Sequence, residues 1–310
     1  MSAPPPEVIA LAEDRRRARG ERDFVSADAL RDRIAEAGWV VTDTPDGFAL
    51  APRPPFDVAA SLADLIARGA AVPAADVGVG LIVDGWPDDV RTCIEALVEH
   101  TDAVILALDC GNVDEAGLVV HDLAVAHPGR VVELHLAQPL EGIGWAQATT
   151  ALIELDPSPA HAVMDMSTVL TGDALGPLQA ALQEPGVVAA GWQGADVDIA
   201  DGWRSVTPAG PGEVDVLLGY LVVVDRPAAL ATPPNPKARF YRNADLEWSL
   251  MMRAAGGRLV VPAGGLPARQ DRHHGYHDSD PELRDRESRR NYDRLLQAFR
   301  GRSELLRPRA

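Results

Sequence analysis

The chain has 310 residues, 46% of them hydrophobic, which is enough for one large domain with an appendage and a sizeable core. Its formal net charge of −17 arises in residues 53–265, where 28 acidic residues stand against 11 lysines and arginines. Such an acidic body repels nucleic acid, so we expect no nucleic-acid partner. A phosphorylated ligand would need a metal ion, or cations from residues 266–310, which carry 11 arginines and 8 acids.

Membrane and secretion signals are absent from the sequence pattern. No run approaches the roughly 20 apolar residues of a membrane helix, and the N-terminus MSAPPPEV lacks the regions of a signal peptide. Cys93 and Cys110 are the only cysteines, which suits a reducing compartment and excludes a thiolate zinc site. We therefore expect a cytoplasmic protein without a transmembrane segment.

Residues 1–52 are predicted to form a small module with a helix and a β-hairpin. Ser26 is a suitable N-cap for the helix. Strands are expected at residues 39–42 and 48–50, on either side of the turn sequence Thr-Pro-Asp-Gly at residues 44–47. The module has its own caps, turn and apolar stripe, so it is expected to be self-contained.

The stretch ARGERDFVSADALRDRIAEAGWVVTDTPDG, residues 18–47, resembles the C-terminal module of cysteinyl-tRNA synthetases. The HIGH and KMSKS signatures of those synthetases are absent from the chain, so the resemblance implies no aminoacylation. Because the chain is acidic, we expect a packing or docking module for a protein partner rather than a tRNA site.

Residues 53–75 are predicted to be a proline-containing linker and a short helix, and residues 76–310 the main domain. In the main domain, strand-like apolar segments alternate with amphipathic helices, which predicts a mainly parallel sheet with right-handed crossovers. The expected strands include Val77–Val83, Ala103–Leu108, Val131–Leu136, His161–Met164 and Val187–Ala190.

Three acidic residues follow these strands directly. They are Asp84, Asp109 and Asp165. Ligands of such sheets bind beyond the carboxyl ends of the strands. We therefore expect the three carboxylates at one ligand-binding edge.

Asp245 is expected at the start of a helix within Phe240–Pro262. A carboxylate there faces free backbone N–H groups and the positive end of the helix dipole, so it should stay ionised. Asp245 is therefore a candidate general base, but an ordinary N-cap fits the same position.

Five motifs follow one another between residues 77 and 300: LDCGNVDEAG, EGIGWAQA, VMDMSTVLTGDAL, LLGYLVVVDR and RNADLEWSLMMRAAGGRLVVP. Their order resembles that of glycosyltransferase family 2, which has the GT-A nucleotide-sugar fold. The resemblance implies an α/β fold with a Rossmann-like, mainly parallel sheet and helices on both faces. The sequence departs from the family pattern where Cys110, Ser167 and Ala244 each replace an acid.

The resemblance also implies roles for particular residues. Those implied to bind the donor nucleotide are Asp84, Asp109 and Asp114, with Asp109 accepting a hydrogen bond from the base, commonly uracil. Those implied to bind a metal ion or the diphosphate are Asp165, Ser167, His273 and His274. Oxygen ligands suit Mg²⁺ or Mn²⁺, so a divalent cation is the expected cofactor. Asp109 and Asp165 also suit ordinary turns, and adjacent histidines in a polar loop can simply be solvated.

In this interpretation Asp245 removes the proton from an acceptor hydroxyl, and the sugar is transferred with inversion. The expected function is that of an inverting glycosyltransferase with a nucleotide-diphosphate donor, a UDP-sugar in particular, and an unidentified acceptor. Because carboxylates are missing from the site, the alternative is a catalytically inactive GT-A-like binding or scaffold protein.

Overall fold

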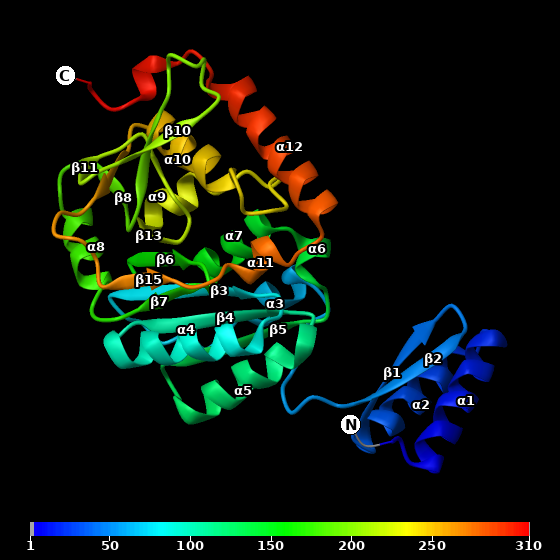
Figure 1. Ribbon diagram of the computed structural model, residues 1–310. Coiled ribbons are helices and arrows are strands. Elements are labelled where there is room, and N and C mark those ends of the chain that lie inside the picture. The colour runs from blue at the N-terminus through cyan, green and yellow to red at the C-terminus, as the bar shows by residue number, and fades with distance from the viewer. Residues whose placement is uncertain (1–2, 310) are drawn as a thin grey trace. The chain divides into compact units, whose positions relative to one another are not determined.

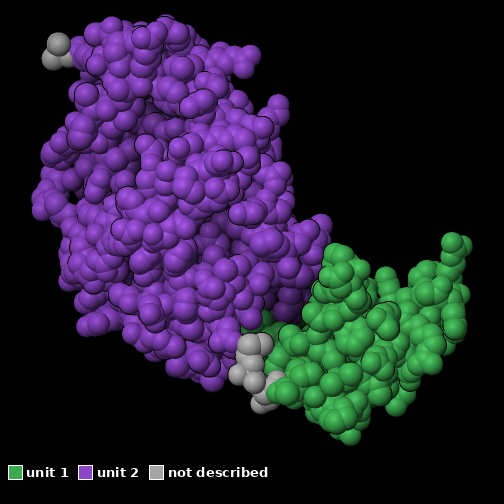
Figure 2. Space-filling model, turned by 45° about the vertical axis from the view of Figure 1, so that its right-hand side comes forward, with its two compact units in different colours: residues 1–57 green, residues 58–310 purple. Residues whose placement is uncertain are grey.

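The computed structural model describes residues 3–309 (Figure 1). The chain divides into two compact units, residues 1–57 and residues 58–310 (Figure 2). Within the described residues, no helix has both the length and the apolarity to cross a membrane.

The first unit packs two helices on an antiparallel hairpin. Its elements are α1 (Pro6–Gly20), α2 (Phe24–Glu36), β1 (Trp39–Thr44) and β2 (Gly47–Pro52). A small core joins them and contains Val8, Ala12, Ile34, Trp39 and Val41. The predicted hairpin is confirmed: Thr44 pairs with Gly47 across the predicted turn.

The predicted cap of α2 is wrong. Asp23 occupies the N-cap position, and its carboxylate accepts a hydrogen bond from the backbone N–H of Ser26 at 3.0 Å. Both residue types are good caps, and they stand three positions apart, which is the distance over which a cap bonds. The sequence pattern alone therefore did not distinguish the capping residue from the residue that is capped.

An eight-stranded sheet forms the centre of the second unit, with the order β11-β14-β8-β13-β6-β3-β4-β5. Its strands are β3 (Val77–Val83), β4 (Val104–Cys110), β5 (Val131–Leu136), β6 (Ala160–Met164), β8 (Val187–Gly191), β11 (Gly212–Glu213), β13 (Leu221–Asp225) and β14 (Arg258–Val261). Strands β5, β4, β3 and β6 are mutually parallel, as are β8 and β14. The predicted mainly parallel sheet is confirmed, with β13 inserted antiparallel between β6 and β8.

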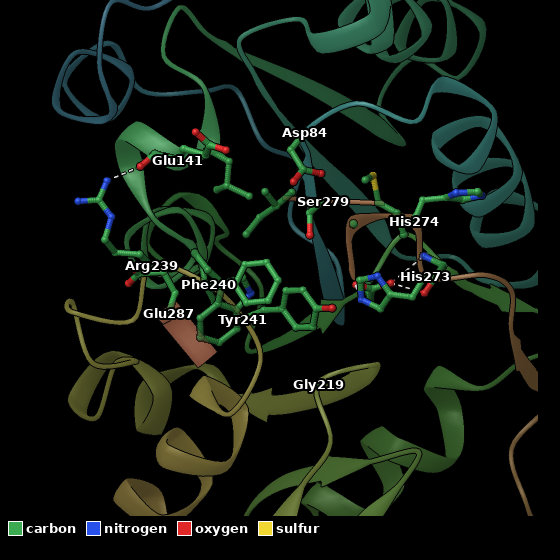
Figure 3. A pocket seen from close by; sticks show the side chains of 18 of the residues that line it. Asp84, Glu141, Gly219, Arg239, Phe240, Tyr241, His273, His274, Ser279 and Glu287 are labelled. Atoms are coloured by element: carbon green, nitrogen blue, oxygen red, sulfur yellow. Dashed lines mark hydrogen bonds and ion pairs between the residues drawn. The ribbon is translucent and has the colours of Figure 1, made fainter. Parts of the chain in front are cut away.

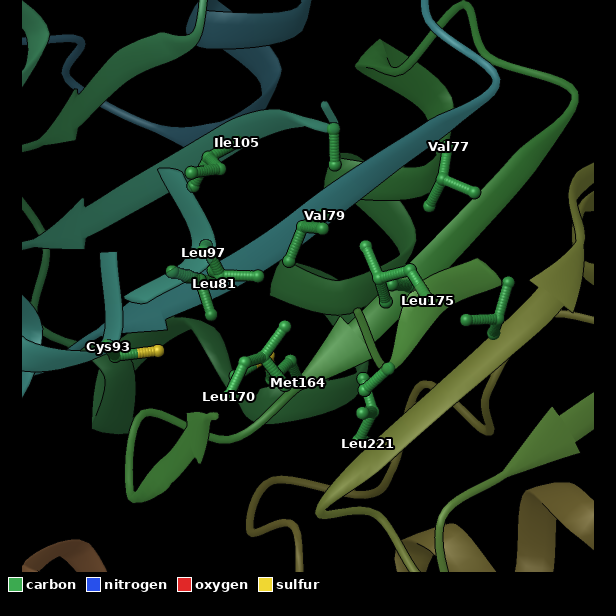
Figure 4. Close-up of a cluster of buried hydrophobic side chains, with 14 of the residues drawn as sticks. Val77, Val79, Leu81, Cys93, Leu97, Ile105, Met164, Leu170, Leu175 and Leu221 are labelled. Atoms are coloured by element: carbon green, nitrogen blue, oxygen red, sulfur yellow. The ribbon is translucent and has the colours of Figure 1, made fainter. Parts of the chain in front are cut away.

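Helices cover both faces of this sheet, as predicted (Figure 1). One face packs against α4 (Pro87–His100), α5 (Ala116–Ala126) and α8 (Leu175–Leu182). The other packs against α3 (Leu62–Arg68), α7 (Trp145–Leu155), α9 (Arg226–Ala231) and α10 (Ala244–Ala254). Alternate residues of β3, beginning with Val77 and Val79, point into the first core, which Figure 4 shows. The residues between them point to the α7 side, because side chains alternate along a strand.

Most of the remaining elements follow strand β6 in the sequence. They are η1 (Val113–Glu115), α6 (Leu140–Ile143), β7 (Thr168–Leu170), β9 (Gly194–Val197), β10 (Val206–Ala209), β12 (Val216–Leu217), β15 (Ala268–Gln270), α11 (His274–His277), α12 (Pro281–Phe299) and η2 (Ser303–Leu305). Strand β15 pairs with β7, which brings the segment before α11 next to the end of β6. Helix α12 packs against α10 through Leu295 and Phe299.

Candidate active site

A cavity of about 630 Å³ lies at the carboxyl ends of β3 and β6 (Figure 3). Asp84 follows β3, Asp165 follows β6, and Asp245 comes from the first turn of α10. The cavity is therefore at the edge where parallel α/β sheets bind ligands. It contains most of the predicted site residues, namely Asp84, Asp165, Ser167, Asp245, His273 and His274.

Asp109 and Asp114 are not among the residues that line the cavity. Asp109 is only 1% exposed, and its Oδ2 lies 2.9 Å from Nδ1 of His135 on β5. Its Oδ1 accepts the backbone N–H of Asn112 at 2.9 Å. Both oxygens are thus engaged inside the protein, which is the turn-forming role rather than base recognition. From this loop, Val113 is the residue that reaches the cavity.

Asp84 and Asp165 form the acidic part of the cavity. Burial raises the pKa of Asp84 to about 6, and the nearby charge of Asp165 adds to the effect. Burial also acts to raise the pKa of Asp165, but hydrogen bonding and charge from His273, together with hydrogen bonds from Ser167, outweigh it and lower this pKa. At neutral pH Asp165 is therefore the more firmly ionised of the two.

Two histidines from the start of α11 are each stacked on an aromatic ring. His273 lies with Nε2 2.7 Å from Oδ2 of Asp165 and stacks on Tyr241, with 4.8 Å between ring centroids. His274 stacks on Trp86 at 5.1 Å, and its Nδ1 lies 2.6 Å from Asp278. Figure 3 shows His273 beside Tyr241 at the edge of the cavity.

Asp245 is in the first turn of α10 but is not its N-cap. Asn243 takes that position, with a left-handed φ of 64° and no side-chain cap bond. The carboxylate of Asp245 instead accepts the N–H of Gly219 on Oδ2 and that of Leu246 on Oδ1, both at 2.9 Å. Burial nevertheless raises the pKa of Asp245 to about 6, so the N-terminal position does not hold the pKa low as expected. A pKa near the working pH suits a general base.

A second acid of α10 has a structural role. Glu247 is 2% exposed, and its Oε2 lies 2.6 Å from the guanidinium of Arg294 on α12. Its Oε1 accepts a hydrogen bond from Asn235 at 2.8 Å. Glu247 is not among the lining residues, so Asp245 is the acid that α10 presents to the cavity.

Several lining residues are not among the site residues predicted from the sequence. Among them are Glu141, Arg239, Tyr241, Arg286 and His161. The guanidinium of Arg239 donates to the backbone carbonyl of Glu141, which joins the loop before α10 to α6 (Figure 3). Apart from Glu141, which begins the motif EGIGWAQA, these positions lie in none of the five motifs, and they come from separate loops, helices and strand β6 that only the fold brings together.

The donor atoms at Asp165 fit one side of a divalent cation. Asp165 and His273 place an oxygen and a nitrogen side by side, and the Ser167 hydroxyl donates to the other oxygen of Asp165. Among the described residues, no group of three or more histidine, cysteine, aspartate or glutamate side chains is arranged to hold a metal ion. A cation here would therefore take its remaining ligands from a diphosphate and water, as Mg²⁺ commonly does.

The sheet, its helices and the position of the cavity define residues 58–310 as a GT-A-fold domain. In particular, this part is similar to the crystal structure of GalNAc-T7 with UDP, GalNAc and Mn²⁺, with a TM-score of 0.57 at 13% sequence identity. That match covers 71% of this chain and 47% of GalNAc-T7. A mannosyltransferase from Pyrobaculum calidifontis in complex with GDP-Man and Mn²⁺ matches with a TM-score of 0.46 at 17% identity, over 67% of this chain and 58% of its own.

The first unit is similar to a different group of proteins. Residues 2–48 match the family model of the cysteinyl-tRNA ligase anticodon binding domain, which confirms the predicted resemblance. The cysteine–tRNA ligase of Opitutus terrae is 54% identical over 48 residues, which are 16% of this chain and 10% of the ligase. That of a Nocardioides species is 57% identical over 40 residues, 13% of this chain and 8% of the ligase. The chain thus spans about a tenth of these relatives, and the likeness concerns this module alone.

Proposed function

We propose that the protein is an inverting glycosyltransferase that transfers a sugar from a UDP-sugar to an acceptor hydroxyl. The observation that carries this proposal is the convergence of Asp84, Asp165 and Asp245 on one cavity at the carboxyl edge of a GT-A-fold sheet. The acceptor enters on the Asp245 side, and the diphosphate lies near Asp165 and His273.

In the proposed reaction Asp245 accepts the proton of the acceptor hydroxyl as its oxygen attacks the anomeric carbon. The bond from that carbon to the diphosphate oxygen breaks on the opposite face, so the configuration inverts and UDP leaves. The Gly219 and Leu246 N–H groups fix the carboxylate in place. Fixed orientation of the base lowers the entropic part of the barrier.

Asp165 and His273 are the residues that would hold a divalent cation. When bound, the cation neutralises charge on the diphosphate and on the departing UDP. The stacked Trp86 and His274 offer a flat surface at the same side of the cavity, suited to a base or sugar ring.

The alternative is a GT-A-like binding or scaffold protein without activity. It is favoured by one observation: both oxygens of Asp165 are engaged by His273 and Ser167 inside the protein. Such internal pairing is the arrangement expected where a carboxylate serves structure rather than metal binding.

The proposal is tested with the purified full-length protein and a panel of nucleotide sugars, with Mn²⁺ or EDTA and a mixture of candidate acceptors. We expect UDP release from at least one UDP-sugar and a product whose anomeric configuration, read by NMR, is opposite to that of the donor. UDP binding without turnover of any donor would favour the scaffold alternative, and a product with retained configuration would contradict the proposed mechanism.

Removal of metal is expected to weaken UDP binding, although the protein alone should hold Mn²⁺ poorly because it supplies few ligands. Ser167→Asp adds a carboxylate next to Asp165 and should tighten UDP binding in Mn²⁺ about tenfold, as a charged ligand contributes about 1.5 kcal/mol. Calorimetry of UDP in Mn²⁺ and in EDTA measures both effects, with Ser167→Asn as the uncharged control. If neither EDTA nor Ser167→Asp changes the affinity, cations that line the cavity, such as His273, Arg286 and Arg290, neutralise the diphosphate instead.

We propose that residues 1–52 bind a protein partner rather than nucleic acid. The module has seven arginines but ten acids, and the buried Arg15 is paired with Asp43 at 2.7 Å. Phe24 and Val25 are 57% and 84% exposed at the start of α2 and offer an apolar contact. A mobility shift of tRNA by the full-length protein at 150 mM salt, about physiological ionic strength, would contradict this assignment.

A further inference from the structure

The cavity extends inward between the sheet and α7. Gly78 and Gly80 of β3 lie opposite His161 and Val163 of the parallel β6. Both glycines face α7, since side chains alternate along a strand and Val77 and Val79 face the other core. Two positions of a central strand thus carry no side chain on the face toward α7. This leaves space that side chains would occupy at most positions of a strand.

A buried carboxylate–imidazole pair takes the room in front of both glycines. Asp156 and His161 are both 0% exposed, and Oδ2 of Asp156 lies 2.7 Å from Nδ1 of His161. A Cβ on Gly78 would lie 2.0 Å from Oδ2 of Asp156, and one on Gly80 would lie 2.7 Å from Nε2 of His161. The glycines are therefore required by the pair.

The other ring nitrogen of His161 has no hydrogen-bond partner among residues 3–309. Its Nε2 and the hydroxyl of Thr149 on α7 are buried side-chain atoms that form no hydrogen bond to any described residue. Both residues line the cavity. A buried polar group without a partner costs about 1–3 kcal/mol, so a ligand or water that bonds these two atoms would be stabilised in this part of the cavity.

The walls around these two polar groups are apolar. The inner pouch, defined here as the part of the cavity lined by Gly80, Ile82, Trp145, Thr149, Leu152, His161 and Val163, has two polar side chains, Thr149 and His161. In the neutral imidazole that donates its Nδ1–H to Asp156, Nε2 is a hydrogen-bond acceptor. The Thr149 hydroxyl can donate as well as accept.

We propose that the inner pouch is a binding site for an apolar group that ends in a hydroxyl. The hydroxyl donates to Nε2 of His161 and accepts from Thr149, and the apolar body contacts Ile82, Leu152 and Val163. One alcohol satisfies both orphaned atoms, whereas a hydrocarbon leaves both unpaired. This assignment is one of binding only and does not depend on sugar transfer.

The test compares benzyl alcohol with toluene and benzyl methyl ether, which have the same ring but no hydroxyl to donate. We expect the full-length protein to bind benzyl alcohol at least fivefold more tightly than either analogue in calorimetry. Binding should also shift the Nε2 resonance of His161 in ¹⁵N NMR, because a new donor reaches that nitrogen. Equal affinity for the three compounds would overturn the proposal. The absence of any binding would also overturn it, and Nε2 would then bond a water molecule.

Thr149→Val removes the hydroxyl at nearly constant volume and should fold, because it deletes an unpaired buried group. It should weaken benzyl alcohol about tenfold, matching the roughly 1–1.5 kcal/mol of one hydrogen bond, and leave toluene unchanged. Thr150→Val is the matched control: its hydroxyl bonds the carbonyl of Ala146 at 2.8 Å, and the residue does not line the cavity. An equal effect of the two substitutions on benzyl alcohol would also overturn the proposal.

Discussion

Asp245→Asn is expected to lower the rate of sugar transfer by about 10²- to 10⁴-fold while UDP binding stays near wild type. Asparagine has no carboxylate to accept the proton of the acceptor hydroxyl. Its amide has one acceptor oxygen, which can bond the N–H of Gly219 or that of Leu246 but not both in the present geometry, so the fold should lose about 1–3 kcal/mol. Transfer to an acceptor must be measured, because donor hydrolysis by water does not require the base in its correct place.

The same assignment fixes the pH dependence of transfer. Because burial raises the pKa of Asp245 to about 6, activity should fall as the pH drops through that value and the base becomes protonated. The sign for stability is opposite. Between the ordinary value of 3.8 and about 6, the folded state binds more protons than the unfolded state at this group, so its contribution to stability decreases as the pH rises.

Glu247→Gln serves as the control on the same helix, since Glu247 does not line the cavity. It should transfer sugar at the wild-type rate per folded molecule. If Asp245→Asn retains wild-type transfer, the carboxylate of Asp245 is structural and the base lies elsewhere. If Glu247→Gln loses transfer while remaining folded, Glu247 has a role that its buried position does not explain.

Glu247→Ala is expected to destabilise the second unit by about 3 kcal/mol, the lower end of the range for breaking a buried ion pair. The substitution leaves the Arg294 guanidinium without its carboxylate in a position that is 19% exposed, and Asn235 without its acceptor. Helices α10 and α12 would lose the polar contact that joins them. Urea unfolding of the full-length protein, followed by circular dichroism, measures the loss.

The control for this prediction is Glu95→Ala on α4. Glu95 is exposed and lies 3.8 Å from the exposed Arg91, so its removal should change the unfolding free energy by less than about 0.5 kcal/mol. Replacing Arg294 with leucine in the Glu247→Ala background should restore part of the stability, because no buried charge is then left unpaired. A loss below about 1 kcal/mol for Glu247→Ala would contradict the structural role.

Local patterns in the sequence determined most of the elements of the second unit. Strands β3 and β5 have the predicted bounds, because the period of apolar residues separates strand from helix within one segment. The rule that ligands bind at the carboxyl ends of parallel strands then placed Asp84 and Asp165 correctly at one cavity. The first inference depends only on residues close together in the sequence, and the second also needs the direction of the strands.

The tertiary structure alone decided which groups meet across elements. The side chain of Asp109 contacts His135 on the neighbouring strand instead of the cavity. The backbone N–H of Gly219, which lies in a distant loop, donates a hydrogen bond to Asp245. Periodicity shows which face of a strand a residue occupies, but not which residue of another element fills the space in front of it. For the same reason the sequence shows Gly78 and Gly80 only as parts of an apolar strand. In the folded protein they leave the space that the buried side chains of Asp156 and His161 occupy. Burial and contacts between residues far apart in the sequence determine the pKa values of the aspartates. They also determine which buried polar atoms have no hydrogen-bond partner, and neither property exists until the chain has folded.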